Sequence, residues 1–235
     1  MFLLSILRTT ATMMTAGLLL AVPASADPKP KEWDPLIEPS NFLSAVTNPY
    51  FPLVPGTTME YSGATRDGNE TLRIEVTHNH KTILDVATTV VIETGSIDGE
   101  VVEIAENWFA QDSEGTVWYF GEFTQEFQDG NPVSTAGSWE AGVDGASPGI
   151  IMLAHPSPGD TYYQEFAPGV AQDQATVMKV DETLTVPYGS YTGVLVTKES
   201  NPLEPGSPER KYYAPGIGLI QEDKGKTALT LIAVH

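Results

Sequence analysis

Two of the four histidines in this chain have the spacing of a metal-ligand pair. His78 and His80 alternate along a segment that reads as extended, so both imidazoles would project to one face. They continue the apolar register of Leu72 to Val76, which would point them inward or into a barrel mouth, and His155 could supply a third ligand. Two nitrogens fill only half of a tetrahedral shell, and the segment is equally typical of a polar strand end. We therefore predict no metal site.

Other chemistry finds little support in the sequence. With 0 cysteines the chain has no thiolate nucleophile, disulfide or thiolate metal site. Neither Gly137-Ser138 nor Gly189-Ser190 lies in a nucleophile elbow, and no acidic turn has the ligand pattern of a calcium loop. Carboxylates for glycoside hydrolysis could be drawn from 31 acidic residues, so the sequence nominates no pair. It predicts no cofactor and leaves open whether the protein is an enzyme.

The charge balance restricts the partners. Against the 31 acidic residues stand 12 basic ones, which gives a formal net charge of −19 and an isoelectric point near 4.3. A surface of this charge repels nucleic acid and anionic membranes. We therefore expect no nucleic-acid partner.

The aromatic residues offer the other candidate site. Trp108 to Glu122 reads as a hairpin of two aromatic-rich runs around a polar turn that ends in Gly115. These side chains could line a pocket, although aromatic residues in strands are more often core residues and cross-strand pairs. The candidate ligand-binding residues, including two from a later apolar segment, are Trp108, Trp118, Phe120, Trp139, Ile151 and Met152.

The elements that would position these residues are strands. Short runs of strand-forming residues, with turn residues between them, follow one another from Met59 to Val133 and return after Thr161. The stretch 137–159 is rich in Gly, Ser and Pro and is expected to be the longest irregular segment, covering one face or an open end of the sheet. No segment has sustained helical periodicity. The sequence predicts an all-β protein in which a single curved antiparallel sheet of about ten strands closes into an open or half barrel.

The N-terminal region predicts export. Residues 1–26 have the charge, the apolar run and the Ala24-Ser25-Ala26 cleavage site of a signal peptide. Residues 27–47 are expected to be an extended Pro-rich leader that packs poorly before about Asn41, and residues 48–235 a single β domain. The protein is thus predicted to be secreted or periplasmic, with no membrane anchoring after cleavage.

Several segments give the chain a resemblance to a family. Val186 to Tyr191, Lys211 to Ile220, the hairpin Trp108 to Glu122 and Gly137 to Gly145 together resemble a pattern found in an uncharacterised family of secreted bacterial β-rich proteins. The resemblance implies a curved antiparallel sheet, loosely like the half barrels of periplasmic lipoprotein carriers. It implies no activity and no site residues.

Two functions remain after this reading. The first is a non-catalytic binding or carrier protein that holds an apolar or amphipathic small molecule between the curved sheet and the segment 137–159. Ile150 to Leu153 would line or plug that opening, or would instead complete the core and leave no cavity. The second is a metal-dependent or carboxylate-based hydrolase with its site at the open end of the sheet.

Overall fold

The computed structural model describes residues 33–65, 68–205 and 208–235. The predicted signal peptide and the leader residues before Trp33 lie outside the described residues. No helix in the described part of the chain is long and apolar enough to cross a membrane.

Alternating burial shows why these sequences form strands. In the second strand Leu72, Ile74 and Val76 are buried, while Arg73 is exposed and Glu75 is half-buried. Side chains of successive strand residues point to opposite faces, so this pattern places one face against the interior. The same alternation recurs along most of the strands.

The described residues form fourteen strands and one short 3-10 helix, η1 (Pro39–Asn41). The strands are β1 (Thr58–Thr65), β2 (Gly68–Ile83), β3 (Val86–Ile97), β4 (Glu100–Gln111), β5 (Val117–Gln128), β6 (Asn131–Ser134), β7 (Trp139–Glu140), β8 (Gly149–Met152), β9 (Thr161–Tyr163), β10 (Gln174–Val186), β11 (Gly189–Ser200), β12 (Glu209–Ala214), β13 (Gly218–Lys224) and β14 (Thr227–Val234).

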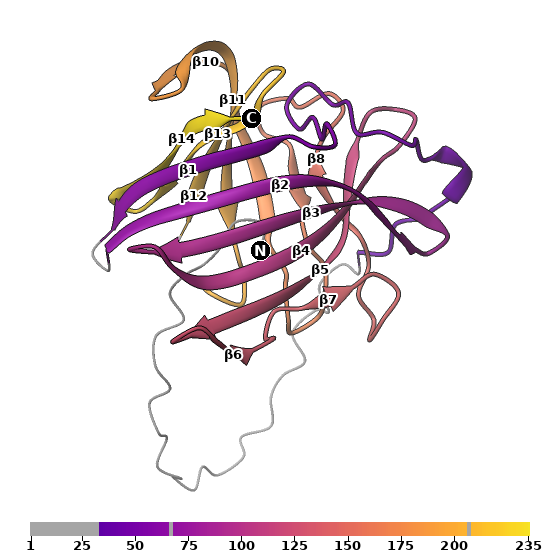
Figure 1. Cartoon of the computed structure of the whole chain (residues 1–235). Coiled ribbons are helices and arrows are strands. Elements are labelled where there is room, and N and C mark those ends of the chain that lie inside the picture. Colours follow the sequence, from indigo (N-terminus) through magenta and orange to yellow (C-terminus); the bar gives the residue numbers. More distant parts are fainter. Residues whose placement is uncertain (1–32, 66–67, 206–207) are drawn as a thin grey trace, which may run out of the picture.

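All fourteen of these described strands belong to one antiparallel sheet. Its order is β6-β5-β4-β3-β2-β1-β14-β13-β12-β11-β10-β9, with β7 and β8 also paired to β5. The sheet therefore consists of two meanders, β1 to β6 and β9 to β14, which join where the first strand pairs with the last. Figure 1 shows the indigo-to-magenta meander as one wall and the orange-to-yellow strands as its continuation.

The predicted fold class is confirmed: the protein is all-β, with a single curved antiparallel sheet that is not closed into a barrel. The described residues contain fourteen strands where the sequence predicted about ten. The additional strands are short segments of two to four residues, and two of them, β7 and β8, lie inside the stretch 137–159. Such short edge segments are paired through tertiary contacts, so their own sequence gives little signal.

Aromatic side chains fill one end of the interior. The rings of Phe109 and Tyr119 stack with 4.7 Å between their centroids. Phe51 contacts Phe109 edge-on at 5.3 Å, and Trp139 contacts Tyr119 edge-on at 5.3 Å. All four are buried, so this end of the sheet is a packed core rather than a pocket.

Phe42, in the described part of the leader (residues 27–47), covers the outer face of the hairpin formed by β4 and β5. Phe42 contacts the rings of Trp118 and Phe120, at centroid distances of 6.5 and 5.5 Å. Further toward the N-terminus the indole nitrogen of Trp33 donates to the carbonyl of Pro148 at 2.8 Å. Leu36 between them is 84% exposed. The described leader therefore touches the sheet at separate anchors rather than along its whole length.

The two ends of the curved sheet face each other along a line that we call the seam. At one point on the seam the backbones of Ser147 and Phe166 form an isolated bridge, and the Ser147 amide donates to the Phe166 carbonyl at 2.9 Å. Beside this bridge Gly149 approaches the carbonyl of Gln164 so closely that a Cβ atom would clash with it. Elsewhere on the seam, in the described part of the chain, no strand ladder joins the two ends.

Candidate functional site

The wall beside the seam carries three rows of inner-face residues across β5, β4 and β3. Their registers are continuous through this part of the sheet, so the members of a row are direct neighbours. Read from β5 to β3, the first row is Glu122, Asn107 and Val91; the second is Thr124, Ala105 and Glu93; and the third is Glu126, Glu103 and Gly95.

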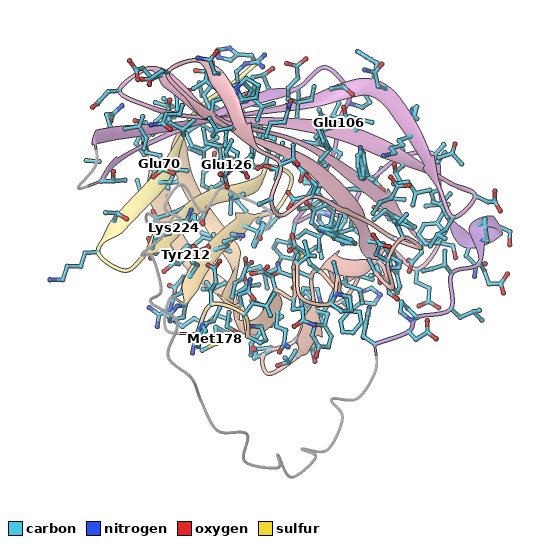
Figure 2. The ribbon with its side chains drawn as sticks, turned by 90° about the horizontal axis from the view of Figure 1, so that it is seen from below. Glu70, Glu106, Glu126, Met178, Tyr212 and Lys224 are labelled. Atoms are coloured by element: carbon cyan, nitrogen blue, oxygen red, sulfur yellow. The ribbon has the colours of Figure 1, made fainter. Side chains whose placement is uncertain are left out.

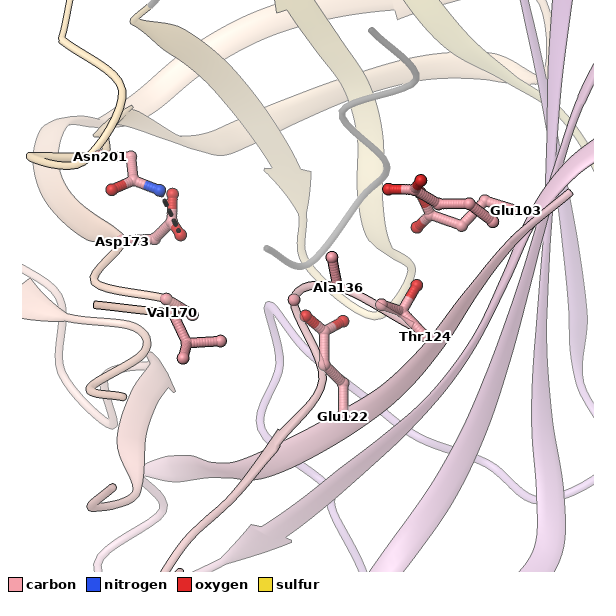
Figure 3. A pocket seen from close by; sticks show the side chains of 10 residues that line it. Glu103, Glu122, Thr124, Ala136, Val170, Asp173 and Asn201 are labelled. Atoms are coloured by element: carbon pink, nitrogen blue, oxygen red, sulfur yellow. Dashed lines mark hydrogen bonds between the residues drawn. The ribbon is translucent and has the colours of Figure 1, made fainter. Parts of the chain in front are cut away.

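A cleft of about 20 Å³ lies where these rows meet the opposite end of the sheet. We call it the seam cleft. On one side it is lined by residues of β4, β5 and the segment before β7, and on the other by the segment between β9 and β10 and by the residue that follows β11. Its lining residues are Glu103, Glu122, Thr124, Glu126, Ala136, Gly137, Val170, Ala171, Asp173 and Asn201 (Figure 3).

The seam cleft is acidic. Four of its ten described lining residues are carboxylates and none is basic. Asp173, across the seam from the three glutamates, accepts a hydrogen bond from Asn201 Nδ2 at 3.2 Å (Figure 3). Burial and the neighbouring Glu122 charge raise the pKa of Glu103 to about 7. Burial, together with the charge of Asp173, also raises the pKa of Glu122, while a hydrogen bond with Tyr119 opposes the rise.

Glu93 lies behind the cleft in the second row. Its neighbour in that row is Ala105, which lies between Glu93 and Thr124. Glu93 is 1% exposed, and its Oε1 atom has no hydrogen-bond partner among the described residues. Burial, and then the Glu122 charge, raise its pKa to about 8, against the attraction of Lys211. A buried acceptor without a partner is costly and calls for a specific reason.

The first row contains a second incompletely paired group. The Tyr119 hydroxyl donates to Asn107 Oδ1 at 2.6 Å, which fixes the orientation of the amide. The Asn107 side chain is fully buried, and its Nδ2 atom has no hydrogen-bond partner. The inner face next to Glu122 is therefore polar, and Tyr119 of the aromatic core fixes the position of the Asn107 amide there.

The opposite wall holds its carboxylates in pairs with lysines. Buried Lys211 on β12 forms an ion pair with Glu199 on β11, with 2.5 Å between Nζ and Oε2. Glu199 Oε1 also accepts from Gln164 Nε2 at 3.0 Å. On β13, Lys224 Nζ lies 3.2 Å from Glu222 Oε1. Figure 2 shows Lys224 and Glu70 at the same end of the molecule as Glu126. Among the described residues, the lysines Lys211 and Lys224 thus belong to this wall, and no basic side chain lines the seam cleft.

This arrangement restricts the chemistry of the cleft. In the described ranges no three His, Cys, Asp or Glu side chains are grouped closely enough to hold a metal ion. A space of about 20 Å³ admits one water-sized group. An ammonium group has that size, carries three donors and a positive charge, and matches a cleft whose described lining includes four carboxylates and no basic side chain.

The structure separates the ligand-binding residues predicted from the sequence. Trp118 and Phe120 lie on the outer face under the leader, and Ile151 and Met152 are fully buried on β8. Trp108 is buried on the outer side, where its indole nitrogen donates to Glu106 at 2.8 Å and Lys81 covers its ring. None of these five is among the described residues that line the seam cleft. Their role as ligand contacts stays a prediction.

Trp139, the sixth predicted residue, lies next to the cleft. It pairs with Glu122 across the β5–β7 ladder and follows the lining residue Gly137 by two positions. Its indole nitrogen is buried without a hydrogen-bond partner. Of the six, it is therefore the residue with a structural connection to the acidic rows.

The expectation that His78 and His80 point inward is wrong. Both residues are exposed. The register between β2 and β3 shifts between Val76 and His80, and this irregularity ends the alternation that keeps Leu72 to Val76 inside.

One further motif match has a structural explanation. Gly145-Ala146-Ser147-Pro148-Gly149 has the letters of a nucleophile elbow, which requires a strand, a sharp turn and then a helix. Here Ser147 forms the backbone bridge to Phe166, and strand β8 begins two residues later. The segment closes the seam and does not present a nucleophile.

The sequence did not predict the acidic rows, because carboxylates are abundant in it and no pair stands out. A signal was nevertheless present: Glu93 shares the parity of Val91, and Glu103 shares that of Ala105 and Phe109, which are positions expected to face inward. A glutamate at an inward position is unusual unless it is paired or functional.

Comparisons with known proteins identify no family. No family model matches the chain, and no curated protein does. Among solved structures the chain is similar to the crystal structure of a candidate lipoprotein from Parabacteroides distasonis ATCC 8503, with a TM-score of 0.41 and 11% sequence identity. The match covers 79% of this chain and 98% of that chain.

Proposed function

We propose that the protein is an exported, non-catalytic binding protein that takes an amphipathic small molecule with a cationic head group at the seam cleft. The observation that carries this proposal is the composition of the cleft: four carboxylates and no basic residue among its described lining residues. A ligand with an ammonium head would be attracted by these carboxylates and would relieve the repulsion among them.

The rim of the cleft suits the apolar part of such a ligand. Val170 and Ala136 line the cleft and are both exposed, so a short alkyl chain leaving the acidic floor would contact apolar surface before it reaches water. The packed aromatic end of the interior offers no comparable space. We therefore propose that the ligand binds at the seam and not beneath residues 150–153.

The experiment that tests this function measures binding of decylamine by isothermal titration calorimetry at pH 8 and physiological salt. We expect saturable binding of one equivalent, at least tenfold weakened by Glu122→Gln, and no binding of decanol or decyl sulfate. Glu114→Gln is the matched control, because Glu114 is exposed in the β4–β5 turn and does not line the cleft. Equal binding of all three amphiphiles, or no binding of decylamine, would refute the proposal.

A carboxylate-based hydrolase is the second candidate, and one observation favours it. Glu103, with its pKa raised to about 7, lies near Glu122 in the same cleft, and carboxyl groups with different surroundings can act as general acid and base. Turnover of a panel of chromogenic glycosides, lost in Glu103→Gln, would support it. No turnover together with decylamine binding would favour the binding protein.

A further inference from the structure

A segment that precedes the first strand contacts both ends of the curved sheet. It consists of residues 33–53, which we call the strap; in Figure 1 it is the indigo chain that leads into β1. Within the described ranges the strand ladders join the two meanders only where β1 pairs with β14, and one isolated bridge crosses the seam. Contacts of the strap with both meanders therefore add a connection that the strand ladders do not provide.

The first anchor of the strap is Trp33, which contacts both sides of the seam. Its indole nitrogen donates to the carbonyl of Pro148 at 2.8 Å, next to the bridging residue Ser147. Its ring lies 5.8 Å from the ring of Tyr163 on β9, which in turn contacts Phe166 edge-on at 5.2 Å. Ser147 and Phe166 are the two partners of the isolated bridge. One side chain thus spans the point at which the two ends of the sheet meet.

Two buried side-chain amides fasten the middle of the strap to the first meander. Gln111, the last residue of β4, accepts through Oε1 from the backbone amides of Thr47 and Asn48, both at 2.7 Å. Asn48 Nδ2 donates to the carbonyls of Gly115 and Leu153, at 2.9 and 3.1 Å. The two amide side chains belong to buried residues, and buried groups that lose such partners pay the full cost of desolvation. This part of the strap is therefore firmly held.

The end of the strap reaches the second meander. The Tyr50 hydroxyl donates to the carbonyl of Gly193 on β11 at 3.2 Å. The amide of Gly216, in the turn between β12 and β13, donates to the carbonyl of Pro49 at 2.7 Å. Phe51 follows directly and is buried in the aromatic core. The strap is thus attached to both meanders within a few residues.

The two halves of the strap are held differently. Residues 46–53, which we call the base, include the buried core residues Val46 and Phe51 as well as the buried amide contacts. Residues 33–38, which we call the arm, alternate between half-buried and exposed, and Leu36 is 84% exposed. Segments with few buried contacts open at a lower free energy than the core. The arm can therefore leave its position while the base stays in place.

We propose that the arm of the strap is a gate for the seam. In the closed position Trp33 holds the two sides together across the bridge of Ser147 and Phe166. When the arm leaves, the bridge loses this support and the sides of the seam separate, while the base keeps the strap attached to both meanders. The interior then opens along the seam without unfolding of the strands, whether or not the cleft binds an amine.

The test uses an introduced thiol as a reporter, because the chain has 0 cysteines. Ala171 lines the seam cleft and is 4% exposed, so the thiol of Ala171→Cys reacts with dithionitrobenzoate only when the seam opens. We expect Trp33→Ala to raise the rate of this reaction about tenfold or more at pH 8. Leu36→Ala is the matched control in the same arm, and we expect it to leave the rate within about twofold.

A second thiol separates opening of the seam from loss of global stability. Val91→Cys places its thiol on the inner face of β3, at a position that is 0% exposed. We expect Trp33→Ala to leave the rate at this position within about twofold, and Asn48→Ala, in the base, to raise the rate at both positions.

Two results would overturn the gate. An unchanged rate at Ala171→Cys in the Trp33→Ala background would show that the seam stays closed without the arm. Equal increases at both thiols in that background would show a general loss of stability. Neither rate is measured with an amine present, so the outcome is independent of the decylamine titration that tests the proposed function.

Discussion

Glu93 shows how much a single buried carboxyl group can determine. It is enclosed on the inner face of β3, and its charged form is disfavoured first by burial and then by Glu122. Charged groups on four other strands act on it: Glu122, Glu103, Glu222 and Lys211. With its pKa raised to about 8, the group is mostly protonated near neutrality, where it is a neutral donor and acceptor.

The first prediction concerns the pH dependence of stability at Glu93. Below its ordinary pKa of 4.5 the carboxyl is protonated in both states, and between 4.5 and about 8 only the unfolded chain ionises. Stability is therefore present at low pH and is lost as the pH rises through about 8. We expect Glu93→Gln to gain roughly 1–3 kcal/mol relative to wild type at pH 8 compared with pH 5. Urea unfolding at both pH values measures this, and parallel curves for the two proteins would contradict it.

The second prediction concerns the buried ion pair of Lys211 and Glu199. Removal of the lysine leaves a carboxylate enclosed with Gln164, Thr197 and Tyr213 but without its cation. We expect Lys211→Met to lose about 3–5 kcal/mol of unfolding free energy.

The double variant Lys211→Met, Glu199→Gln removes both charges and keeps a hydrogen-bonding side chain. It is expected to recover at least about 1 kcal/mol of that loss in chemical denaturation. A double variant less stable than Lys211→Met would mean that the charge left behind is not the cause.

At the residue scale the sequence predicted the buried apolar positions but not the site. Leu72, Ile74 and Val76 were recognisable because apolar side chains alternate with polar ones. Glu93, Glu103 and Glu122 occupy inward positions as well, but 31 acidic residues offer many carboxylates, and the alternation within one strand does not say which of them meet. That depends on the register between strands, which is a three-dimensional property.

At the scale of elements, β5 contributes to both environments of the interior, the aromatic core and the acidic rows. Its inner face passes from the aromatic core at Tyr119 to the acidic rows at Glu122, and its outer face lies under Phe42. The change of surroundings coincides with an irregularity at Phe120 and Gly121, where the register with β4 shifts. Gly121 has φ of +134°, and a Cβ there would clash with the carbonyl of Trp139. The bulge thus lets β7 approach β5 beside the cleft.

The third prediction tests the closed end of the seam. Gly149 approaches the carbonyl of Gln164, so Gly149→Ala must push β8 away from the segment after β9. We expect a loss of about 2 kcal/mol or more in unfolding free energy.

Gly189→Ala is the matched control for this substitution. Gly189 also begins a strand, and like Gly149 it has no positive φ, but a Cβ there would meet only the movable end of the Tyr191 side chain. We expect its stability to change by less than about 1 kcal/mol. Similar losses in both variants would show that the effect is conformational rather than a contact across the seam.

The meander was predictable at this scale because each long strand carries its own alternation and ends in a turn. Asp98-Gly99 and Asp129-Gly130 are turns with positive φ at both residues, which the sequence marks as Asp-Gly pairs. The sequence did not predict β7 and β8 within the segment 137–159. These strands have two and four residues and pair only with β5, so they carry no periodicity of their own.

At the scale of the whole molecule, the sheet depends on one junction. The two meanders are connected through the pairing of β1 with β14, in the middle of the strand order. The junction extends beyond the strands, since Thr58 and His235 exchange two backbone hydrogen bonds of 3.0 and 2.9 Å. Leu231 and Tyr61 are buried directly on it.

The fourth prediction is that removal of β14 divides the molecule. A chain that ends after Lys226 leaves β1 and β13 without a shared partner and removes Leu229 and Leu231 from the core. We expect the cooperative thermal transition to disappear and the two meanders to exchange amide hydrogen rapidly. A truncated protein with a single sharp transition would contradict this view of the junction.

The position of β14 also has a consequence for the order of events during synthesis. During synthesis β1 is made before the whole second meander, so it gains its second neighbour, β14, only after β9 to β13 have been made. During that interval the first meander ends in an unpaired strand edge, which is a template for association with another nascent chain. Pairing of the eight-residue strand β14 with β1 therefore ends this exposure, and any delay in that pairing lengthens the period in which the protein is prone to aggregate.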